Sequence, residues 1–348
     1  MQHPKIGKID PETFESFLLN RLGSEDETVL VKPQMGVDAA VVDIGGGQVL
    51  VVAEDPILSV PGLSHDMFGW CAVHIGASDV AVMGVRPRYM CYTLLMPPDT
   101  KDSDFRAIVD SIHKEARDLG IAIIGGHTGY YPGFAAPTIG GITVFAVANR
   151  DEYITPAGAE PGDDVILTKG PAIEAAGILA MVRESELLLR YPPAAVKKAK
   201  SLCRQMTVVR DAAVASEVGV HAMHDATEGG VLGGLYEMAK ASDVGMDIDE
   251  SRFVYPEEVE MVCQAFGIDS AAAISEGSLL ISAPPKNAPE ILRRMNEAGI
   301  SASVIGSVLE DRKVRTMRRR DGSITRLSIP DQDPFWPVFF QGLGIEEC

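Results

Sequence analysis

Hydrophobic and polar positions alternate along this chain in two periods, one typical of short strands and one typical of amphipathic helices. The clearest helix is predicted over residues 104–119, where one face carries Phe105, Ile108, Val109, Ile112, Ala116 and Leu119. In the first half, the pattern also predicts strands at 29–31, 39–43, 49–53, 88–96, 121–124 and 138–147, and a helix of small residues at 64–85. In the second half it predicts strands at 165–168, 218–223, 278–282 and 302–308, and helices at 173–183, 208–218, 257–266 and 288–298. Alternating strands and helices indicate an α/β chain.

A break in this alternation lies at residues 151–162, where Pro156, Gly158, Pro161 and Gly162 cluster. The chain has 348 residues, which is enough for two domains with hydrophobic cores. We therefore expect domains at 1–154 and 155–330, followed by a C-terminal tail at 331–348.

The strand predicted at 218–223 is followed by an acid, Asp225, a hydroxyl residue, Thr227, and two glycines, Gly229 and Gly230. A helix is predicted to begin after them. Glycines permit a sharp turn there, and the first N–H groups of a helix, with its positive dipole end, favour an anion such as phosphate. The alternative is a tight turn with glycines needed only for packing.

Three acids of the first half lie in apolar surroundings: Asp38, Asp55 and Asp79. An ionised carboxylate is rarely found in an apolar environment unless it is paired with a cation or bound to a metal. Mg²⁺ binds carboxylate, phosphate and water oxygens, so these three residues are the expected metal ligands. The alternatives are an N-cap role for Asp38, a turn position for Asp55 and a buried ion pair for Asp79.

A second glycine segment, Gly125-Gly126-His127-Thr128, follows the strand predicted at 121–124. Open α/β sheets bind ligands at the carboxyl ends of their strands, so we expect this segment to line the same site. His127 is the expected proton-transfer residue because an imidazole titrates near neutral pH. The alternative role for His127 is that of a hydrogen-bonding wall residue.

Composition and charge exclude several classes of function. A formal net charge of −18 argues against nucleic acid as a partner, since phosphate backbones are bound by clustered lysine and arginine. The one basic run, 313–320, is interpreted as the solvated face of a hairpin. No apolar run reaches the length of a membrane span, and no signal peptide is evident. Five scattered cysteines indicate free thiols in a reducing compartment, so we expect a cytoplasmic protein.

Several motifs occur in a fixed order: Gly36-Val-Asp-Ala-Ala-Val, Ala77-Ser-Asp-Val-Ala-Val-Met-Gly, Gly125-Gly-His-Thr, Pro161-Gly-Asp-Asp and His224-Asp-Ala-Thr-Glu-Gly-Gly. In this order they resemble the aminoimidazole ribonucleotide (AIR) synthase superfamily, and most closely its HypE-like, AIR synthase-related members. The resemblance covers about residues 30–310. It implies a two-domain fold, with an N-terminal mixed sheet that forms a barrel in a homodimer and a C-terminal α/β sandwich.

The resemblance also implies ATP with Mg²⁺ as cofactors and assigns roles to residues of both halves. Asp38, Asp55 and Asp79 would hold Mg²⁺, with Asp79 and His127 taking part in catalysis. The nucleotide would be bound by Asp38, Asp55, Gly125, Gly126, Thr128, Asp225, Thr227, Gly229 and Gly230.

The reaction implied is HypE-like: phosphoryl activation of a carboxamide oxygen in hydrogenase maturation, on a small-molecule or carbamoyl-type substrate, with a maturation partner protein. Three departures leave alternatives open, because Val37, Ser78 and Glu228 stand where the family often has an acid, an asparagine and, in HypE, an arginine. The alternatives are a small-molecule kinase resembling thiamine-monophosphate kinase and a nucleotide-binding maturation scaffold with little turnover. HypE carries its substrate group on a C-terminal cysteine. Cys348 is the last residue here, but two adjacent glutamates would raise the pKa of its thiol.

Overall fold

The computed structural model of this chain describes residues 6–344, which divide into two compact units. The N-terminal unit contains residues 26–32 and 38–153, and the C-terminal unit contains residues 6–25, 33–37 and 154–344. Two segments near the start of the chain thus group with the unit formed by the second half. Within the described range, no helix has the length and apolar character needed to cross a bilayer.

The N-terminal unit is built on a six-stranded sheet in the order β1-β2-β3-β6-β4-β5. Its strands are β1 (Val29–Val31), β2 (Ala40–Gly45), β3 (Gln48–Leu58), β4 (Tyr89–Met96), β5 (Ala122–Tyr130) and β6 (Thr138–Asn149). The sheet is mixed, since β4 and β5 run parallel while the other neighbours run antiparallel. The mixed N-terminal sheet expected from the sequence is therefore present.

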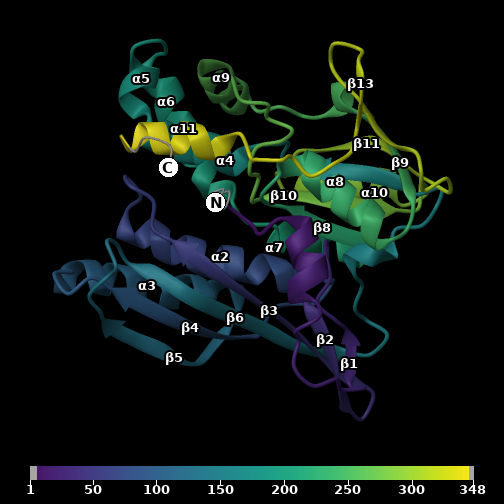
Figure 1. Ribbon diagram of the computed structural model, residues 1–348, viewed down its shortest axis with the longest axis horizontal. Helices are drawn as coiled ribbons and strands as arrows, with labels where there is room; N and C mark the ends of the chain where they lie inside the picture. The colour runs from purple at the N-terminus through teal and green to yellow at the C-terminus, as the bar shows by residue number, and fades with distance from the viewer. Residues whose placement is uncertain (1–5, 345–348) are drawn as a thin grey trace. The chain divides into compact units, whose positions relative to one another are not determined.

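Two helices, α2 (His65–Val82) and α3 (Asp102–Leu119), cover one face of this sheet (Figure 1). Small residues allow α2 to approach its neighbours closely. A side chain at Gly69 would meet the Ile108 carbonyl oxygen of α3 at 2.7 Å, and one at Gly76 would meet the Ile142 side chain of β6 at 2.8 Å. The α3 helix buries Ile108, Ile112 and Ala116 as its periodicity predicts, and ends at Gly120 in the left-handed conformation.

The edge strand β5 differs from the prediction made for it. The sequence predicts a strand at 121–124 followed by a glycine turn, but the strand runs unbroken from Ala122 to Tyr130. Gly126 has φ +142°, and its Cα lies so close to Tyr92 of β4 that a side chain would overlap the Tyr92 carbonyl oxygen. Glycine at position 126 therefore allows the two strands to approach closely. The strand was predicted too short because glycines have no side chains and so show no alternation of hydrophobic and polar residues.

The C-terminal unit contains a seven-stranded sheet in the order β13-β12-β9-β11-β7-β10-β8. Its strands are β7 (Asp164–Thr168), β8 (Ala222–Ala226), β9 (Gly245–Asp249), β10 (Ser278–Ala283), β11 (Ala302–Leu309), β12 (Arg315–Arg318) and β13 (Ile324–Arg326). Leu279, Leu280 and Ile281 of β10 are all fully buried, so both faces of the sheet are covered there. The basic run at 313–320 forms part of the β12–β13 hairpin, as expected.

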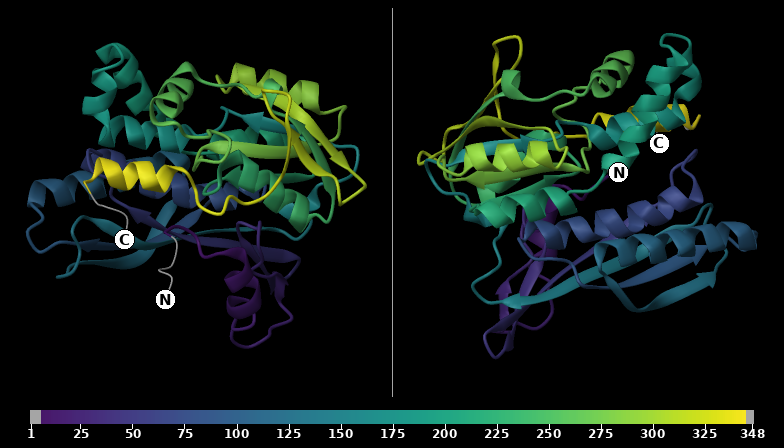
Figure 2. Two further views of the ribbon diagram at one scale, coloured as in Figure 1. Left: turned by 45° about the horizontal axis from the view of Figure 1, so that its top comes forward. Right: turned by 180° about the vertical axis from the view of Figure 1, so that it is seen from behind.

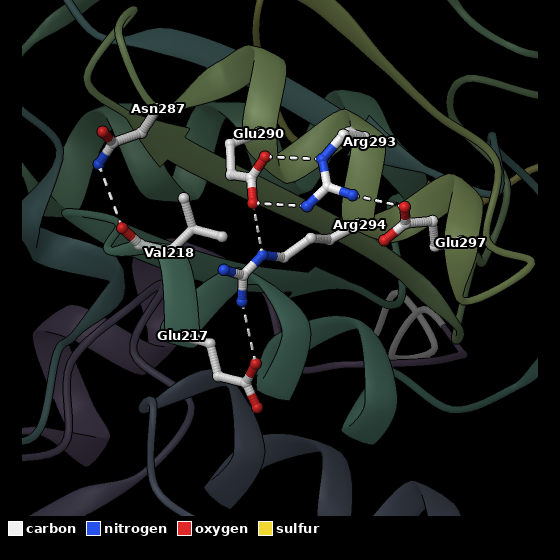
Figure 3. Close-up of polar contacts among 7 residues, drawn as sticks. All are labelled: Glu217, Val218, Asn287, Glu290, Arg293, Arg294 and Glu297. Carbon is white, nitrogen blue, oxygen red and sulfur yellow. Dashed lines mark hydrogen bonds and ion pairs between the residues drawn. The ribbon is translucent and has the colours of Figure 1, made fainter.

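Helices of the C-terminal unit fall into two groups. One group packs around α4 and lies together in both views of Figure 2; it comprises α4 (Ile173–Val182), α5 (Glu184–Leu188), α6 (Pro193–Lys200), α9 (Glu257–Phe266) and α11 (Phe335–Gly342). The other group contacts the sheet and comprises α7 (Val209–Val218), α8 (Gly230–Ala241) and α10 (Ala288–Glu297). On the surface, Glu290 of α10 accepts from Arg293 and Arg294, and Arg294 reaches Glu217 of α7 (Figure 3).

Short helical turns complete the C-terminal unit. They are α1 (Pro11–Thr13), the π-helical turn Phe14–Leu18, and the 3-10 turns Pro156–Gly158, Ser201–Gln205 and Glu250–Arg252. Within the segment 6–25, Glu15 pairs with Lys240 of α8.

The described part of the tail, residues 331–344, is packed. Phe335 and Phe339 of α11 are buried and their rings stack 5.2 Å apart. The Arg183 guanidinium donates to the Val338 carbonyl oxygen at 2.8 Å. The aromatic run at 333–340 thus packs as its composition indicates, whereas Cys348 lies outside the described residues.

Candidate functional site

Asp55 lies on the helix-covered face of the N-terminal sheet. Along β3 the odd-numbered residues Val49, Val51 and Ala53 are buried, which identifies them as the face that contacts α2. Asp55 continues this row and is the cross-strand partner of Ile142, so the two side chains share a face. The ladder shifts register between Asp55 and Ile57, so Asp55 precedes a bulge and does not end the strand.

Asp79 reaches the same region from α2. Gly76 lies against the Ile142 side chain, and Asp79 is three residues further on the same side of the helix. Its neighbours Ser78 and Val80 are fully buried, while Asp79 itself is half-buried. Because Ile142 faces both Asp55 and Gly76, Asp55 lies level with the part of α2 that immediately precedes Asp79.

Asp38 lies just before β2 and is also half-buried. The strands β2 and β3 are antiparallel with Ala40 opposite Val52, so the chain at Asp38 is level with the end of β3 that carries Asp55. The three predicted metal ligands thus all belong to the N-terminal unit, but among residues 6–344 their carboxylate oxygens do not lie within 4.8 Å of one another.

Gly125, Gly126, His127 and Thr128 lie elsewhere in the same unit. Across the sheet, Asp55 of β3 pairs with Ile142 of β6, Ile142 with Tyr92 of β4, and Tyr92 with Gly126 of β5. Strand β5 is therefore three strands away from β3, which is about 14 Å at the usual strand spacing. His127 is exposed, and its Nε2 lies 2.5 Å from the Tyr131 hydroxyl. Within the sheet, this segment is therefore separate from the three aspartates.

In the C-terminal unit, β8 carries His224 and Asp225 into the interior. The strand runs to Ala226, three residues beyond its predicted end, and all of it is buried. Asp225 pairs with Leu279 of β10, and the His224 Nε2 lies 3.1 Å from the Glu237 carboxylate of α8. His221 instead contacts Asp163 at 2.9 Å, so the two imidazoles have different acidic neighbours.

The turn from Thr227 to Gly229 connects β8 to α8, as the sequence predicts. Gly229 and Gly230 have φ of +86° and +63°, and a side chain at Gly230 would lie 2.6 Å from the Ala273 carbonyl oxygen. Close packing therefore requires glycine at position 230.

Several N–H groups at the start of α8 already have acceptors within the unit. The Gly230 N–H donates to the Thr227 carbonyl oxygen at 3.0 Å, and the Leu232 N–H donates to the Ala271 carbonyl oxygen at 2.8 Å. The Gly229 N–H donates to the Asp333 carboxylate at 2.8 Å. The expected anion site thus holds a side-chain carboxylate of the same chain.

Two acids that the sequence prediction missed lie near this turn. Burial raises the pKa of Glu174 to about 7, with the Asp333 and Glu228 carboxylates adding to the shift, although the Glu276 N–H donates to it. Burial also raises the pKa of Asp333 to about 6 against the N–H groups that donate to it. Glu174 could have been noticed as an acid in the first turn of a predicted helix. No local pattern indicates that Asp333 meets a residue 104 positions away.

Curated proteins similar to this chain include the carbamoyl dehydratase HypE of Cupriavidus necator. It is 29% identical over 303 residues, which cover 84% of this chain and 82% of that protein.

Solved structures share the fold across almost the whole chain. A HypE–HypF complex matches with a TM-score of 0.72 at 20% identity, covering 91% of this chain and 99% of that one. The hydrogenase maturation protein HypE in complex with ATP matches with a TM-score of 0.69 at 22% identity, covering 94% and 97%.

Both halves of the chain match models of one protein family. Residues 36–148 match the N-terminal domain of AIR synthase related proteins, and residues 160–318 match their C-terminal domain. The mixed α/β architecture with two sheets agrees with this assignment. The chain belongs to the AIR synthase-related family.

Proposed function

We propose that this protein is an ATP- and Mg²⁺-dependent enzyme of the HypE type, which activates a carboxamide oxygen by phosphoryl transfer in hydrogenase maturation. The observation that carries the proposal is that Asp38, Asp55 and Asp79 all lie in the N-terminal unit, with Asp38 level with the end of β3 that carries Asp55. Similarity to the carbamoyl dehydratase HypE and to an ATP-bound HypE structure supports it.

The donor set suits the metal. Asp55 on a strand and Asp79 on a helix are half-buried carboxylates, and Mg²⁺ prefers such oxygens. When bound, the metal neutralises phosphate charge during transfer. The chain's own part is to fix the carboxylates, because both are carried by regular secondary structure with buried neighbours.

The remaining predicted residues keep their proposed roles. Asp225, Thr227, Gly229 and Gly230 would contact the nucleotide, as would Gly125, Gly126 and Thr128. His127 is about 14 Å from Asp55 across the sheet, so we propose that it moves a proton on the acceptor substrate and does not touch the metal.

In the overall reaction, a terminal phosphoryl group is transferred to the oxygen of a carbamoyl group. The C–O bond of that phosphorylated group then breaks, the nitrogen loses its protons, and a nitrile, ADP and phosphate are formed. The phosphate carries away the oxygen, so no oxidant or reductant is needed.

We also propose a homodimer, assembled through the N-terminal sheet, and a cytoplasmic location. Ile123, Ile124 and Tyr130 of the edge strand β5 are exposed, and an exposed apolar edge favours pairing with a second copy. The four cysteines among residues 6–344 are free thiols, which suits a reducing compartment. The similarity to a HypE–HypF complex supports a protein partner in maturation.

The test combines purified protein, Mg-ATP and a peptide bearing a carbamoylated cysteine thiol. We expect ADP, phosphate and nitrile in equal amounts, measured by chromatography and mass spectrometry. Recovery of a stable phosphorylated small molecule would instead identify a kinase. Nucleotide binding without turnover would identify a maturation scaffold. A Cys348→Ser variant then decides whether the chain's own terminal thiol carries the substrate.

A further inference from the structure

A cavity of about 490 Å³ lies within the N-terminal unit, where α2 and α3 end and β4 begins. Near the end of β6, Val147 and Ala148 form another part of its wall. Three charged side chains line the cavity: Arg86, Arg88 and Glu152. A void of this size accommodates a small metabolite, and two cations with one anion favour a ligand of negative charge.

The end of α3 fixes the position of the Arg86 guanidinium. This group donates to the Leu119 carbonyl oxygen at 3.3 Å, at the helix end where a cation is favoured. A side chain at Gly120 would lie 2.5 Å from the Arg86 Nη2, so glycine at this position, with φ +75°, leaves room for the guanidinium. A guanidinium has five N–H donors and this contact uses one of them, so the others remain for a ligand.

Arg88 is held by its backbone at the start of β4. Its N–H donates to the Phe145 carbonyl oxygen at 3.2 Å, and its own carbonyl oxygen accepts from the Ala122 N–H at 2.8 Å. The Arg88 guanidinium carbon lies 5.8 Å from the centre of the Tyr89 ring. The sheet therefore sets where this second guanidinium begins, beside the cavity that it lines.

Neither arginine of the cavity forms an ion pair with an acidic side chain of residues 6–344, although the whole chain has 49 acidic residues against 31 lysines and arginines. Nearby acids have other partners. Asp43 pairs with Arg150 at 2.6 Å, and the Glu152 carboxylate accepts from the Asn149 N–H at 3.3 Å. The charge of two neighbouring guanidinium groups is therefore available to an external anion.

The number of guanidinium groups indicates which anion fits. A carboxylate has two oxygens, and one guanidinium can pair with both of them. A phosphoryl group has three outer oxygens and a charge near −2, so it can accept from two guanidinium groups at once. Two arginines in one cavity thus suit a phosphoryl group better than a carboxylate.

We propose that this cavity is a binding site for the phosphoryl group of a small phosphate monoester, with Arg86 and Arg88 as its ligands. The site is separate from Asp55. Val147 lies five residues along β6 from Ile142, the cross-strand partner of Asp55, which is about 17 Å at the usual rise of a strand. The inference therefore goes beyond the proposed function and does not rest on it.

The first test measures by calorimetry how the full chain binds glycerol 3-phosphate, inorganic phosphate and acetate, with EDTA and without nucleotide. A salt concentration of about 0.15 M screens general attraction to the surface. We expect both phosphates to bind and acetate to bind at least tenfold more weakly. Tighter binding of glycerol 3-phosphate identifies a monoester as the ligand, and equal binding of the two phosphates identifies free phosphate. Acetate binding as tightly as phosphate overturns the phosphoryl assignment.

Variants locate the binding. Arg86→Gln and Arg88→Gln should each weaken the affinity for glycerol 3-phosphate at least fivefold. Arg117→Gln is the matched control, since it removes the same charge from an exposed side chain in the last turn of α3 but does not line the cavity. Equal losses in all three variants would show a general effect of charge and overturn the site.

Two further variants guard against a folding artefact, because Arg86→Gln also removes the contact to Leu119. Ala148→Leu keeps both arginines but adds bulk to the cavity wall, and should weaken binding as well. Arg88→Lys keeps the charge but loses the paired donors, and should bind better than Arg88→Gln and less well than wild type. Urea denaturation checks that each variant is folded. Unchanged binding by a folded Ala148→Leu variant places the phosphate elsewhere.

The proposed function fails in a different way from this site. Asp55→Asn should lose affinity for Mg²⁺ with the non-hydrolysable analogue AMPPCP and keep its affinity for glycerol 3-phosphate, whereas Arg88→Gln should show the reverse. Loss of both ligands in Asp55→Asn would mean a single site and overturn the inference. If wild type binds glycerol 3-phosphate but not Mg-AMPPCP, the proposed function is wrong and the phosphoryl site is supported.

Discussion

Glu54 and Asp55 are neighbours in β3, yet their carboxylates lie on opposite faces of the N-terminal sheet. The Glu54 carboxylate accepts from the Thr143 hydroxyl at 2.9 Å on the face away from α2, whereas Asp55 shares the α2 face with Ile142. Substitutions at this pair can therefore separate the proposed metal-binding role of Asp55 from a general effect of negative charge on the sheet.

The first prediction uses that separation. Asp55→Asn should weaken the affinity for Mg-AMPPCP at least tenfold, about 1.4 kcal/mol, because a neutral amide is a poorer Mg²⁺ ligand than a carboxylate. Glu54→Gln, which makes the same chemical change one residue away, should leave the affinity unchanged. Calorimetry at several Mg²⁺ concentrations measures the affinity of both variants for Mg-AMPPCP. An equal loss of affinity in the two variants would show that Asp55 is not a metal ligand.

The second prediction concerns the glycine that lets α2 approach β6. Gly76→Ala gains about 1 kcal/mol of helix propensity but forces its methyl group to 2.8 Å from Ile142, an overlap that costs about 1–3 kcal/mol. We expect a net loss of stability and weaker nucleotide binding, because α2 carries Asp79.

Chemical denaturation of the single and double variants tests this contact. In an Ile142→Ala background the overlap is absent, so Gly76→Ala should no longer destabilise the protein. An equal cost in both backgrounds would show that the loss does not come from Ile142.

The third prediction concerns pH. The pKa of Glu174 is raised from 4.5 to about 7 by burial and by the Asp333 and Glu228 carboxylates, with Lys8 acting in the opposite direction. A raised folded-state pKa means that the stabilising contribution is full below pH 4.5 and is lost as pH rises through 7.

Glu174→Gln should therefore stabilise the protein relative to wild type by an amount that grows between pH 5 and pH 8, to about 1–3 kcal/mol. Urea denaturation at each pH measures this difference. The exposed Glu217→Gln provides the matched control, since its carboxylate meets Arg294 at the surface. A difference that does not change with pH would exclude titration of Glu174 as its origin.

The fourth prediction concerns the edge strand. Gly126→Ala should separate β5 from β4, because the added methyl group overlaps the Tyr92 carbonyl oxygen, and should weaken the proposed homodimer. Gly133→Ala is the control, since Gly133 also has positive φ, +104°, but nothing lies within 4 Å of its added Cβ. Sedimentation velocity should show monomer for the first variant only. Dimers of unchanged affinity in both would place the interface away from β5.

Much of the fold follows from local patterns. The helix α3 was predictable because its apolar residues recur every three or four positions, and the strand–turn–helix unit at β8 because glycines follow a buried strand. The edge strand β5 was predicted too short, because its glycines interrupt the alternation of hydrophobic and polar residues from which strands are predicted. Strands β9, β12 and β13 are short and lie toward one edge of their sheet, so their patterns are weak.

The candidate site divides in the same way. Asp55 and Asp79 stood out because each is an acid among apolar neighbours, a property visible in a few residues of sequence. Asp333 and Lys8 did not, because their importance comes from contacts to Gly229 and Thr227 that only the folded chain creates. Glu228 was noticed as a reversal of charge, but its role in binding both Lys8 and Trp336 needed the structure.

Lys8, near the start of the chain, and Trp336, near its end, contact the same turn before α8, and this has a practical consequence for anyone who produces the protein. A purification tag fused at either end adds mass and charge within a few residues of Lys8 or of α11, the segments that contact this turn. Cleavable tags, or an insertion in the exposed Gly45–Gly47 hairpin of the other unit, are the safer choice.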